Sequence, residues 1–219
     1  MDSLQNRLIF ALSILKDNDH SARLILSDLL ESEGDTNLAD WTRAKKKSWR
    51  KRLDGVIGVL PHMITLQITC DFVAKGLLSL PTRQAGWPQT LNDEDLSPLA
   101  HEVENVSRWA RGESPETILD ESLRKISSVH PWQYGILNIS IMMQSLHLAI
   151  SCAVTAEKDT ANARKHADSS RNASRKVIKA TREMTKRHPK GNFNMSDLRA
   201  WQFSHTISVL ESHLTVTDS

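Results

Sequence analysis

The amino-acid sequence predicts an all-α protein, a compact multi-helix bundle of about eight to nine helices around a central apolar helix at about 134–154. Apolar residues recur at spacings of three and four along almost the whole chain of 219 residues, which is the period of one helix face. No run of alternating apolar and polar residues is flanked by hairpin turn residues, so strands are not expected.

Two helices are predicted at the beginning of the chain. The first carries an apolar stripe from Leu4 to Leu15. The second begins at Ser21 and ends near Gly34, because glycine suits the left-handed conformation that often follows the last turn of a helix.

A third predicted helix opens at Asn37 or Asp40 and contains the most basic stretch of the chain, RAKKKSWRKR at 43–52. Helical spacing places Trp49 and Leu53 on one apolar face, while most of the basic side chains lie elsewhere. The tryptophan is therefore expected to pack inward. Two glycines and a proline in 55–61 predict a break at that point.

The middle of the chain contains a buried helix and a long loop. Residues 62–80 are mostly apolar, and residues 81–98 contain three prolines and an acidic cluster. This loop is the predicted boundary between an N-terminal helical part (1–80), which includes the basic third helix, and a C-terminal helical part (99–219). We expect the two parts to pack together as one domain.

Five further helices are predicted after the loop. Proline is favoured at the first position of a helix, so the first of the five is expected to begin at Ser97-Pro98 and to end at Arg111-Gly112. The helix at about 134–154 is apolar on every side, which is typical of a central helix. The others are a short helix that opens at Ser114-Pro115, a basic helix with a stripe of small residues at 157–187, and a last helix from Ser196.

The net charge of +2 conceals a segregation of charge along the chain. Residues 43–52 hold seven Lys or Arg and no acid, and residues 164–190 hold ten against two acids. The remainder is strongly acidic, with acids concentrated in 17–40 and 92–121. Such a bipolar chain either pairs its own segments or presents opposite charges to different partners.

The sequence contains no recognisable motif for catalysis, cofactor binding or metal binding. We therefore predict that the protein is not an enzyme and holds no cofactor or metal. His101 and Glu102 are adjacent on a predicted helix, where neighbouring side chains diverge by roughly 100°, so they do not form a dyad. An enzyme whose catalytic site is assembled from scattered histidine and glutamate side chains is a further hypothesis, but no motif in the sequence supports it.

A cytoplasmic location is expected, with no association with a membrane. The segment MDSLQNRLIF lacks the features of a secretory signal, and no window of about 20 residues is apolar enough to span a bilayer. Cys70 and Cys152 both lie in apolar helical patterns, which indicates buried free thiols in a reducing compartment.

Two charged surfaces are candidates for binding a partner. A turn tryptophan is a typical interface anchor, opposite charges steer association, and a basic helix contacts phosphates. The acidic surface consists of Trp87, Asp93, Glu94, Asp95, Glu102, Glu113 and Glu116. The basic face consists of Arg43, Lys46, Lys47, Arg50 and Lys51.

The segments ITCDFVAKGLLSL and LAHEVENVSRWARGESPETILDESLRK, with an acidic loop between them, resemble the helical immunity proteins of bacterial polymorphic toxin systems. The matching positions are Cys70-Asp71 and Trp109 to Glu113, and the resemblance covers about residues 68–128. It implies an intracellular protein that neutralises a toxin by binding it. It implies no catalytic residues.

These observations predict a non-enzymatic protein that binds another macromolecule. The predicted partner is a protein, which could be a toxin. In this interpretation it is a bacterial immunity or defence factor, and its acidic surface would suit a basic nuclease toxin. The alternative is a helical nucleic-acid-binding protein that uses the basic segments 43–52 and 164–190.

Overall fold

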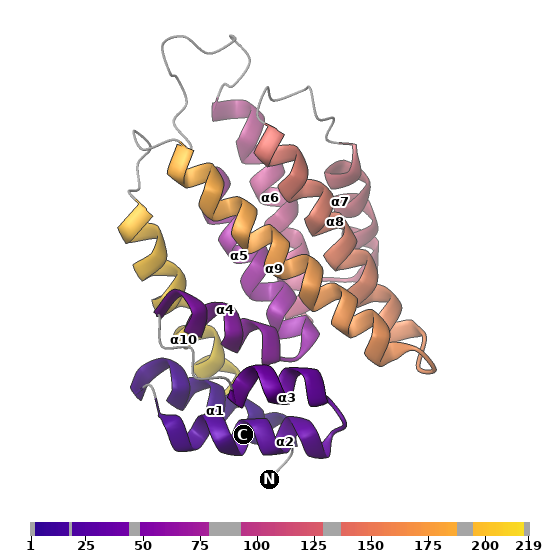
Figure 1. Cartoon of the computed structure of the whole chain (residues 1–219). Coiled ribbons are helices and arrows are strands. Elements are labelled where there is room, and N and C mark those ends of the chain that lie inside the picture. Colours follow the sequence, from indigo (N-terminus) through magenta and orange to yellow (C-terminus); the bar gives the residue numbers. More distant parts are fainter. Residues whose placement is uncertain are drawn as a thin grey trace. The chain divides into compact units, whose positions relative to one another are not determined.

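The computed structural model describes residues 3–17, 19–43, 49–78, 93–128, 137–187 and 195–216. These residues form ten α-helices and no strand, so the predicted all-α class is confirmed (Figure 1). There are ten helices where eight to nine were expected because α3 (Thr36–Arg43) and α4 (Trp49–Val59) stand in place of the single predicted third helix.

The chain forms two compact units, one made of residues 1–61 and 200–219 and the other of residues 62–199. The first unit contains α3 and α4, and its other helices are α1 (Ser3–Asp17), α2 (His20–Ser32) and most of α10 (Met195–Val216). The second contains α5 (His62–Leu78), α6 (Asp93–Ala110), α7 (Glu116–Ser127), α8 (Leu137–Lys158) and α9 (Ala163–Arg187). The boundary predicted at 81–98 lies mostly outside the described residues and stays a prediction.

Helix α2 has defined signals at both ends. The Asp19 carboxylate accepts hydrogen bonds from the backbone N–H groups of Ser21 at 2.8 Å and Ala22 at 3.2 Å, which satisfies two unpaired donors of the first turn. At the other end Gly34 has a φ of 78°, and its N–H donates to the carbonyl of Glu31 at 2.8 Å. The predicted role of Gly34 at the end of this helix is confirmed.

Helix α4 is more regular than its glycines suggested. It runs through Gly55 and Gly58 and ends at Val59, so the break predicted at 55–61 is confined to the last two of those residues. Leu53 and Ile57 are fully buried, as the predicted apolar face requires. The side chain of Trp49 lies outside the description.

Helix α6 begins five residues before the predicted start. It opens at Asp93, and Pro98 lies inside the helix and not at its first position. Asp93, Glu94 and Asp95 form its first residues, where negative charges are favoured by the positive end of the helix dipole. A start at Asp93 therefore gives these acids a favourable position that a start at Pro98 would have denied them.

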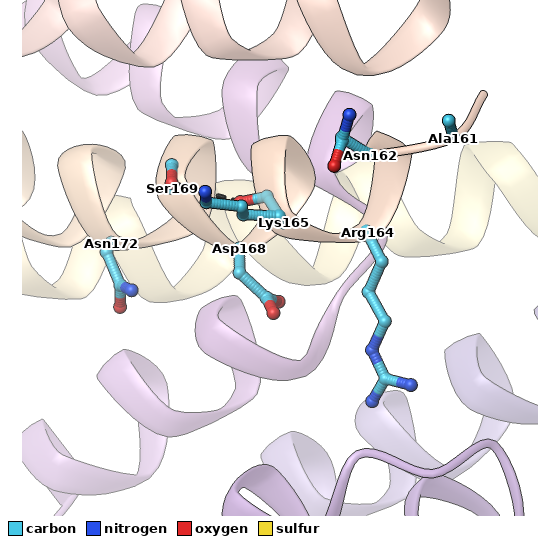
Figure 2. A pocket seen from close by; sticks show the side chains of 7 residues that line it. All are labelled: Ala161, Asn162, Arg164, Lys165, Asp168, Ser169 and Asn172. Carbon is cyan, nitrogen blue, oxygen red and sulfur yellow. Dashed lines mark hydrogen bonds between the residues drawn. The ribbon is translucent and has the colours of Figure 1, made fainter. Parts of the chain in front are cut away.

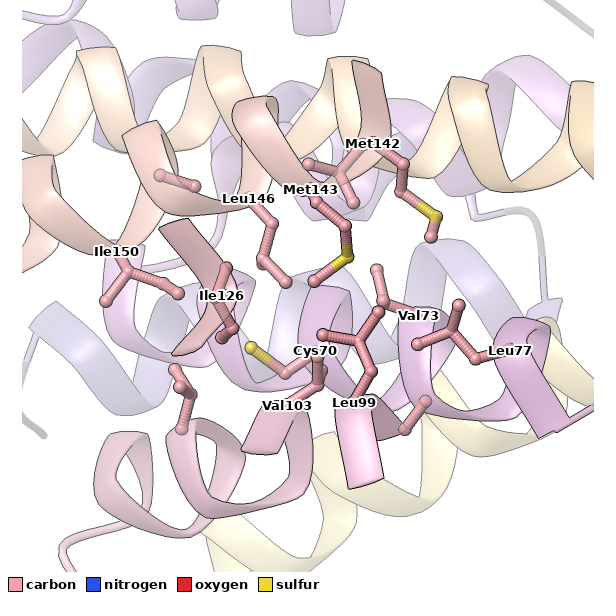
Figure 3. Packing of buried hydrophobic residues seen from close by; sticks show 14 of the residues in the cluster. Cys70, Val73, Leu77, Leu99, Val103, Ile126, Met142, Met143, Leu146 and Ile150 are labelled. Carbon is pink, nitrogen blue, oxygen red and sulfur yellow. The ribbon is translucent and has the colours of Figure 1, made fainter. Parts of the chain in front are cut away.

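Helix α8 supplies the centre of the core in the second unit. The core cluster draws residues from α5, α6, α7, α8 and α9 (Figure 3). From α8 it takes Ile139, Met142, Met143, Leu146, Ala149, Ile150 and Ala153, each at most 1% exposed. The opposite side of α8 is not covered, because Ile141 is 45% exposed and Leu148 50% exposed. None of the described helices combines the length and the apolar character that a membrane span requires.

Helices α8 and α9 pack through small side chains. The predicted stripe on α9 is confirmed except at its first residue. Ala167, Ser170, Ser174 and Ile178 are buried, whereas Ala163 is only partly buried. The Ser170 hydroxyl donates to the Ala149 carbonyl of α8 at 2.8 Å. Small residues allow two helix backbones to approach closely, so this contact fixes which side of α9 faces the core.

Candidate functional site

Arg43, the first residue of the predicted basic face, pairs with acids of its own unit. Its guanidinium donates to Asp28 at 2.8 Å and to Glu31, and Asp40 lies 3.7 Å away. The hydrogen bonds to Asp28 and Glu31 raise the pKa of Arg43. These acids belong to the acidic segment 17–40, so at Arg43 the basic run pairs with an acidic segment of the same chain.

The rest of the basic face lies at the edge of what the structure describes. Lys46 and Lys47 are outside the described residues. Arg50 and Lys51 belong to the first turn of α4, but their side chains are outside the description. Their predicted role in binding stays a prediction.

The first four residues of the predicted acidic surface also lie outside the description, entirely or in their side chains. Trp87 lies outside the described residues, and Asp93, Glu94 and Asp95 form the start of α6 without described side chains. The structure thus gives contacts for three of the predicted acidic residues, namely Glu102, Glu113 and Glu116.

Glu102 connects α6 to α7. Only 8% of the residue is exposed, and its carboxylate accepts hydrogen bonds from the Ser122 hydroxyl and the Lys125 ammonium group, both at 2.7 Å. Burial pushes the pKa of Glu102 upward, but the hydrogen bonds from Lys125 and Ser122 outweigh it, so the pKa is lowered. A carboxylate held in this way stabilises the helix pair.

The substitution Glu102→Gln is expected to lower the free energy of unfolding by about 1–2 kcal/mol at pH 7, because it removes a hydrogen bond between charged groups. A lowered folded-state pKa gives stability that is present above the unfolded pKa, near 4.5, and lost as the pH falls through the folded value. Urea unfolding of both proteins between pH 7 and pH 3 tests this. The difference between them should shrink in acid, and a difference independent of pH would contradict the assignment.

The turn between α6 and α7 fixes two acidic side chains at the surface. Gly112 has a φ of 77°, which allows the chain to reverse there. Arg111 donates to the two Glu113 oxygens from Nε at 2.8 Å and from Nη2 at 3.0 Å. Glu116, at the start of α7, pairs with Lys158 of α8. We call Arg111, Gly112, Glu113 and Glu116 the α6–α7 corner.

A polar chain links the α6–α7 corner to α5. The Arg111 guanidinium donates to the Ser107 hydroxyl at 3.1 Å, and that hydroxyl donates to Asp71 at 2.6 Å. Asp71, Arg111 and Glu113 are among the positions that carry the resemblance to immunity proteins. Ser107 is the residue that joins them, and the sequence offered no signal for it beyond its place one helical turn before Arg111.

The histidine and cysteine side chains of the second unit that could carry chemistry are separated, paired or buried. His101 is exposed on α6 whereas Glu102 is buried, as their helical spacing predicts. His62 Nε2 lies 3.0 Å from Glu157, and burial lowers the pKa of this histidine. Cys70 is fully buried, which raises the pKa of its thiol well above the usual value. Within the described ranges no three His, Cys, Asp or Glu side chains gather as metal ligands.

The outward side of α9 is basic and uncovered. Lys165, Lys176 and Lys179 are exposed, opposite the residues packed on α8. A shallow depression of about 470 Å³ adjoins the first turns of α9 (Figure 2). It is lined by Ala161, Asn162, Arg164, Lys165, Asp168, Ser169 and Asn172. No histidine is among these lining residues.

Comparison of the chain with protein-family models, with curated proteins and with solved structures finds no significant match.

Proposed function

We propose that the protein is a non-enzymatic macromolecule-binding protein, an immunity or defence factor that neutralises a toxin by binding it. The partner is a protein with a basic surface, and the binding surface is the α6–α7 corner. The proposal includes a bacterial origin and a cytoplasmic site of action, where the free thiols of Cys70 and Cys152 fit a reducing compartment.

The observation that carries the proposal is the fixed position of Glu113 and Glu116. Each side chain is about half exposed, and each is held by a basic partner, Arg111 and Lys158 respectively. A side chain that is already ordered loses less conformational entropy when a partner binds. The α6–α7 corner therefore presents ordered carboxylate groups on a rigid pair of helices.

The electrostatics of the corner favour recognition rather than chemistry. The hydrogen bond from Arg111 lowers the pKa of Glu113, so this carboxylate stays charged at neutral pH and is a poor general base. Charged groups at the rim of an interface steer the encounter and exclude partners of the same sign. Arg111, Glu113 and Glu116 together leave the corner net negative, so a basic toxin surface would complement it.

The experiment uses the polypeptide encoded beside this protein, expressed alone and together with it. We expect growth arrest in the first case and relief in the second, with a complex measurable by calorimetry. The double substitution Glu113→Arg and Glu116→Arg should weaken that complex at least about tenfold, because it places like charges in contact.

The matched control is Asp17→Arg with Asp40→Arg, which changes the net charge equally on exposed positions of α1 and α3. This variant should bind as the parent does. A neighbouring polypeptide that is not toxic, or that does not bind the purified protein, would remove the proposal.

A further inference from the structure

Five residues on α9 form a straight line on its outward side. They are Lys165, Ser169, Asn172, Lys176 and Lys179. Successive members are three or four residues apart, so all five lie within about 40° of one another around the helix on either side of Lys165. We call this set the lysine stripe. Its ends are 14 residues apart in sequence, which corresponds to a length of about 21 Å.

The lysines of the stripe differ from the other basic residues described above. Arg43, Arg111, Lys125 and Lys158 each lie against a carboxylate of their own unit. Within the described part of the chain, no carboxylate lies within ion-pair distance of Lys165, Lys176 or Lys179. Asp168 is next to the stripe, but it pairs with Arg171. The stripe therefore carries positive charge that these acids do not neutralise.

The packing of α9 holds the stripe in place. The opposite side of the helix is buried, including Ser174, Val177 and Thr181. The Thr181 hydroxyl contacts the sulfur of Met142 on α8 at 3.3 Å. Because the helix cannot rotate without exposing this side, the three lysines keep their spacing and direction.

The composition of the stripe favours a nucleic acid over an acidic protein. The cores of protein interfaces are depleted in lysine and enriched in aromatic residues, and the stripe contains no apolar or aromatic side chain. Among the described residues of the second unit, the large apolar side chains that are exposed, Leu78, Ile141 and Leu148, lie on α5 and α8. By contrast, lysine, asparagine and serine are common contacts to phosphate oxygens.

We propose that the lysine stripe of α9 binds the phosphate backbone of a nucleic acid without reading its base sequence. The stripe is about 21 Å long and the major groove is about 12 Å wide, so its lysines can contact phosphates on both sides of that groove at once. This inference concerns a different surface from the α6–α7 corner and does not depend on the proposed binding of a toxin.

The test measures binding of the purified chain to a 20-base-pair DNA duplex of random sequence, to an RNA duplex and to polyglutamate, by fluorescence anisotropy. The variant replaces Lys165, Lys176 and Lys179 by glutamine, which has a similar helix propensity. We expect it to bind duplexes of all sequences more weakly by at least about tenfold at roughly 50 mM salt. The negative slope of log affinity against log salt concentration should become shallower by about three, because three phosphate contacts are lost.

The control variant Lys16→Gln, Arg108→Gln and Arg124→Gln removes the same charge from exposed positions on α1, α6 and α7. It should bind the duplexes as the parent does. Three results would overturn the inference: no binding of the parent to either duplex at roughly 50 mM salt, unchanged binding by the stripe variant, or polyglutamate bound as tightly as the duplexes. None of these measurements involves a toxin, so either proposal can fail alone.

Discussion

Replacement of Leu146 by alanine is expected to lower the free energy of unfolding of the 62–199 unit by about 3 kcal/mol. Leu146 is fully buried near the middle of α8, within the cluster that joins α5, α6, α7, α8 and α9. Its removal leaves a cavity among rigid neighbours, so the loss includes both the transfer of the side chain and the unfilled volume.

A matched control lies two residues away on the same helix. Leu148 is 50% exposed, and Leu148→Ala should change the free energy of unfolding by no more than about 0.5 kcal/mol. Both substitutions have the same chemistry and nearly the same helix propensity change. Urea unfolding followed by circular dichroism compares the two midpoints. Equal losses at both positions would mean that α8 is not oriented as described.

The substitution Ser170→Leu is expected to lower the free energy of unfolding of the second unit by about 3 kcal/mol or to prevent the unit from folding. Ser170 is fully buried where α9 meets α8, and its hydroxyl donates to the Ala149 carbonyl at 2.8 Å. A leucine there must push the two helices apart and leaves that carbonyl without its side-chain donor.

The control for this substitution is Asn172→Leu, which adds a similar side chain to the exposed side of α9. It should leave the unfolding midpoint almost unchanged. Soluble yield and the thermal midpoint by circular dichroism are measured for both variants. A Ser170→Leu protein as stable as the parent would show that α8 and α9 do not approach closely at this point.

Much of the fold could be predicted because each helix carries its own periodic signal. On the predicted central helix, Ile139, Met143, Leu146 and Ile150 recur at spacings of three and four and are all buried. The sequence could not reveal how much of α8 its neighbours cover. Ile141 and Leu148 are as apolar as the buried residues, yet they are exposed, because periodicity identifies a face but not the helices packed against it.

The candidate sites were harder to predict because ion pairs depend on tertiary proximity. The composition of the chain indicates where the acidic and basic segments are. It does not indicate that Glu102 pairs with Lys125, 23 residues away, or that Lys158 pairs with Glu116. The predicted start of α6 was also wrong, because Pro98 lies inside the helix and not at its first position.

The division of the chain has a consequence for the order of synthesis. The first unit is discontinuous: an ion pair joins Lys16 of α1 to Glu211 of α10, 195 residues later, at 2.5 Å. The second unit is continuous and can make its contacts as soon as residues 62–199 have left the ribosome. Helices α1 to α4 are synthesised first, whereas the ion pair between Lys16 and Glu211 can form only after the whole second unit has been made. The first unit is therefore completed last, although its first four helices are the first part of the chain to be made.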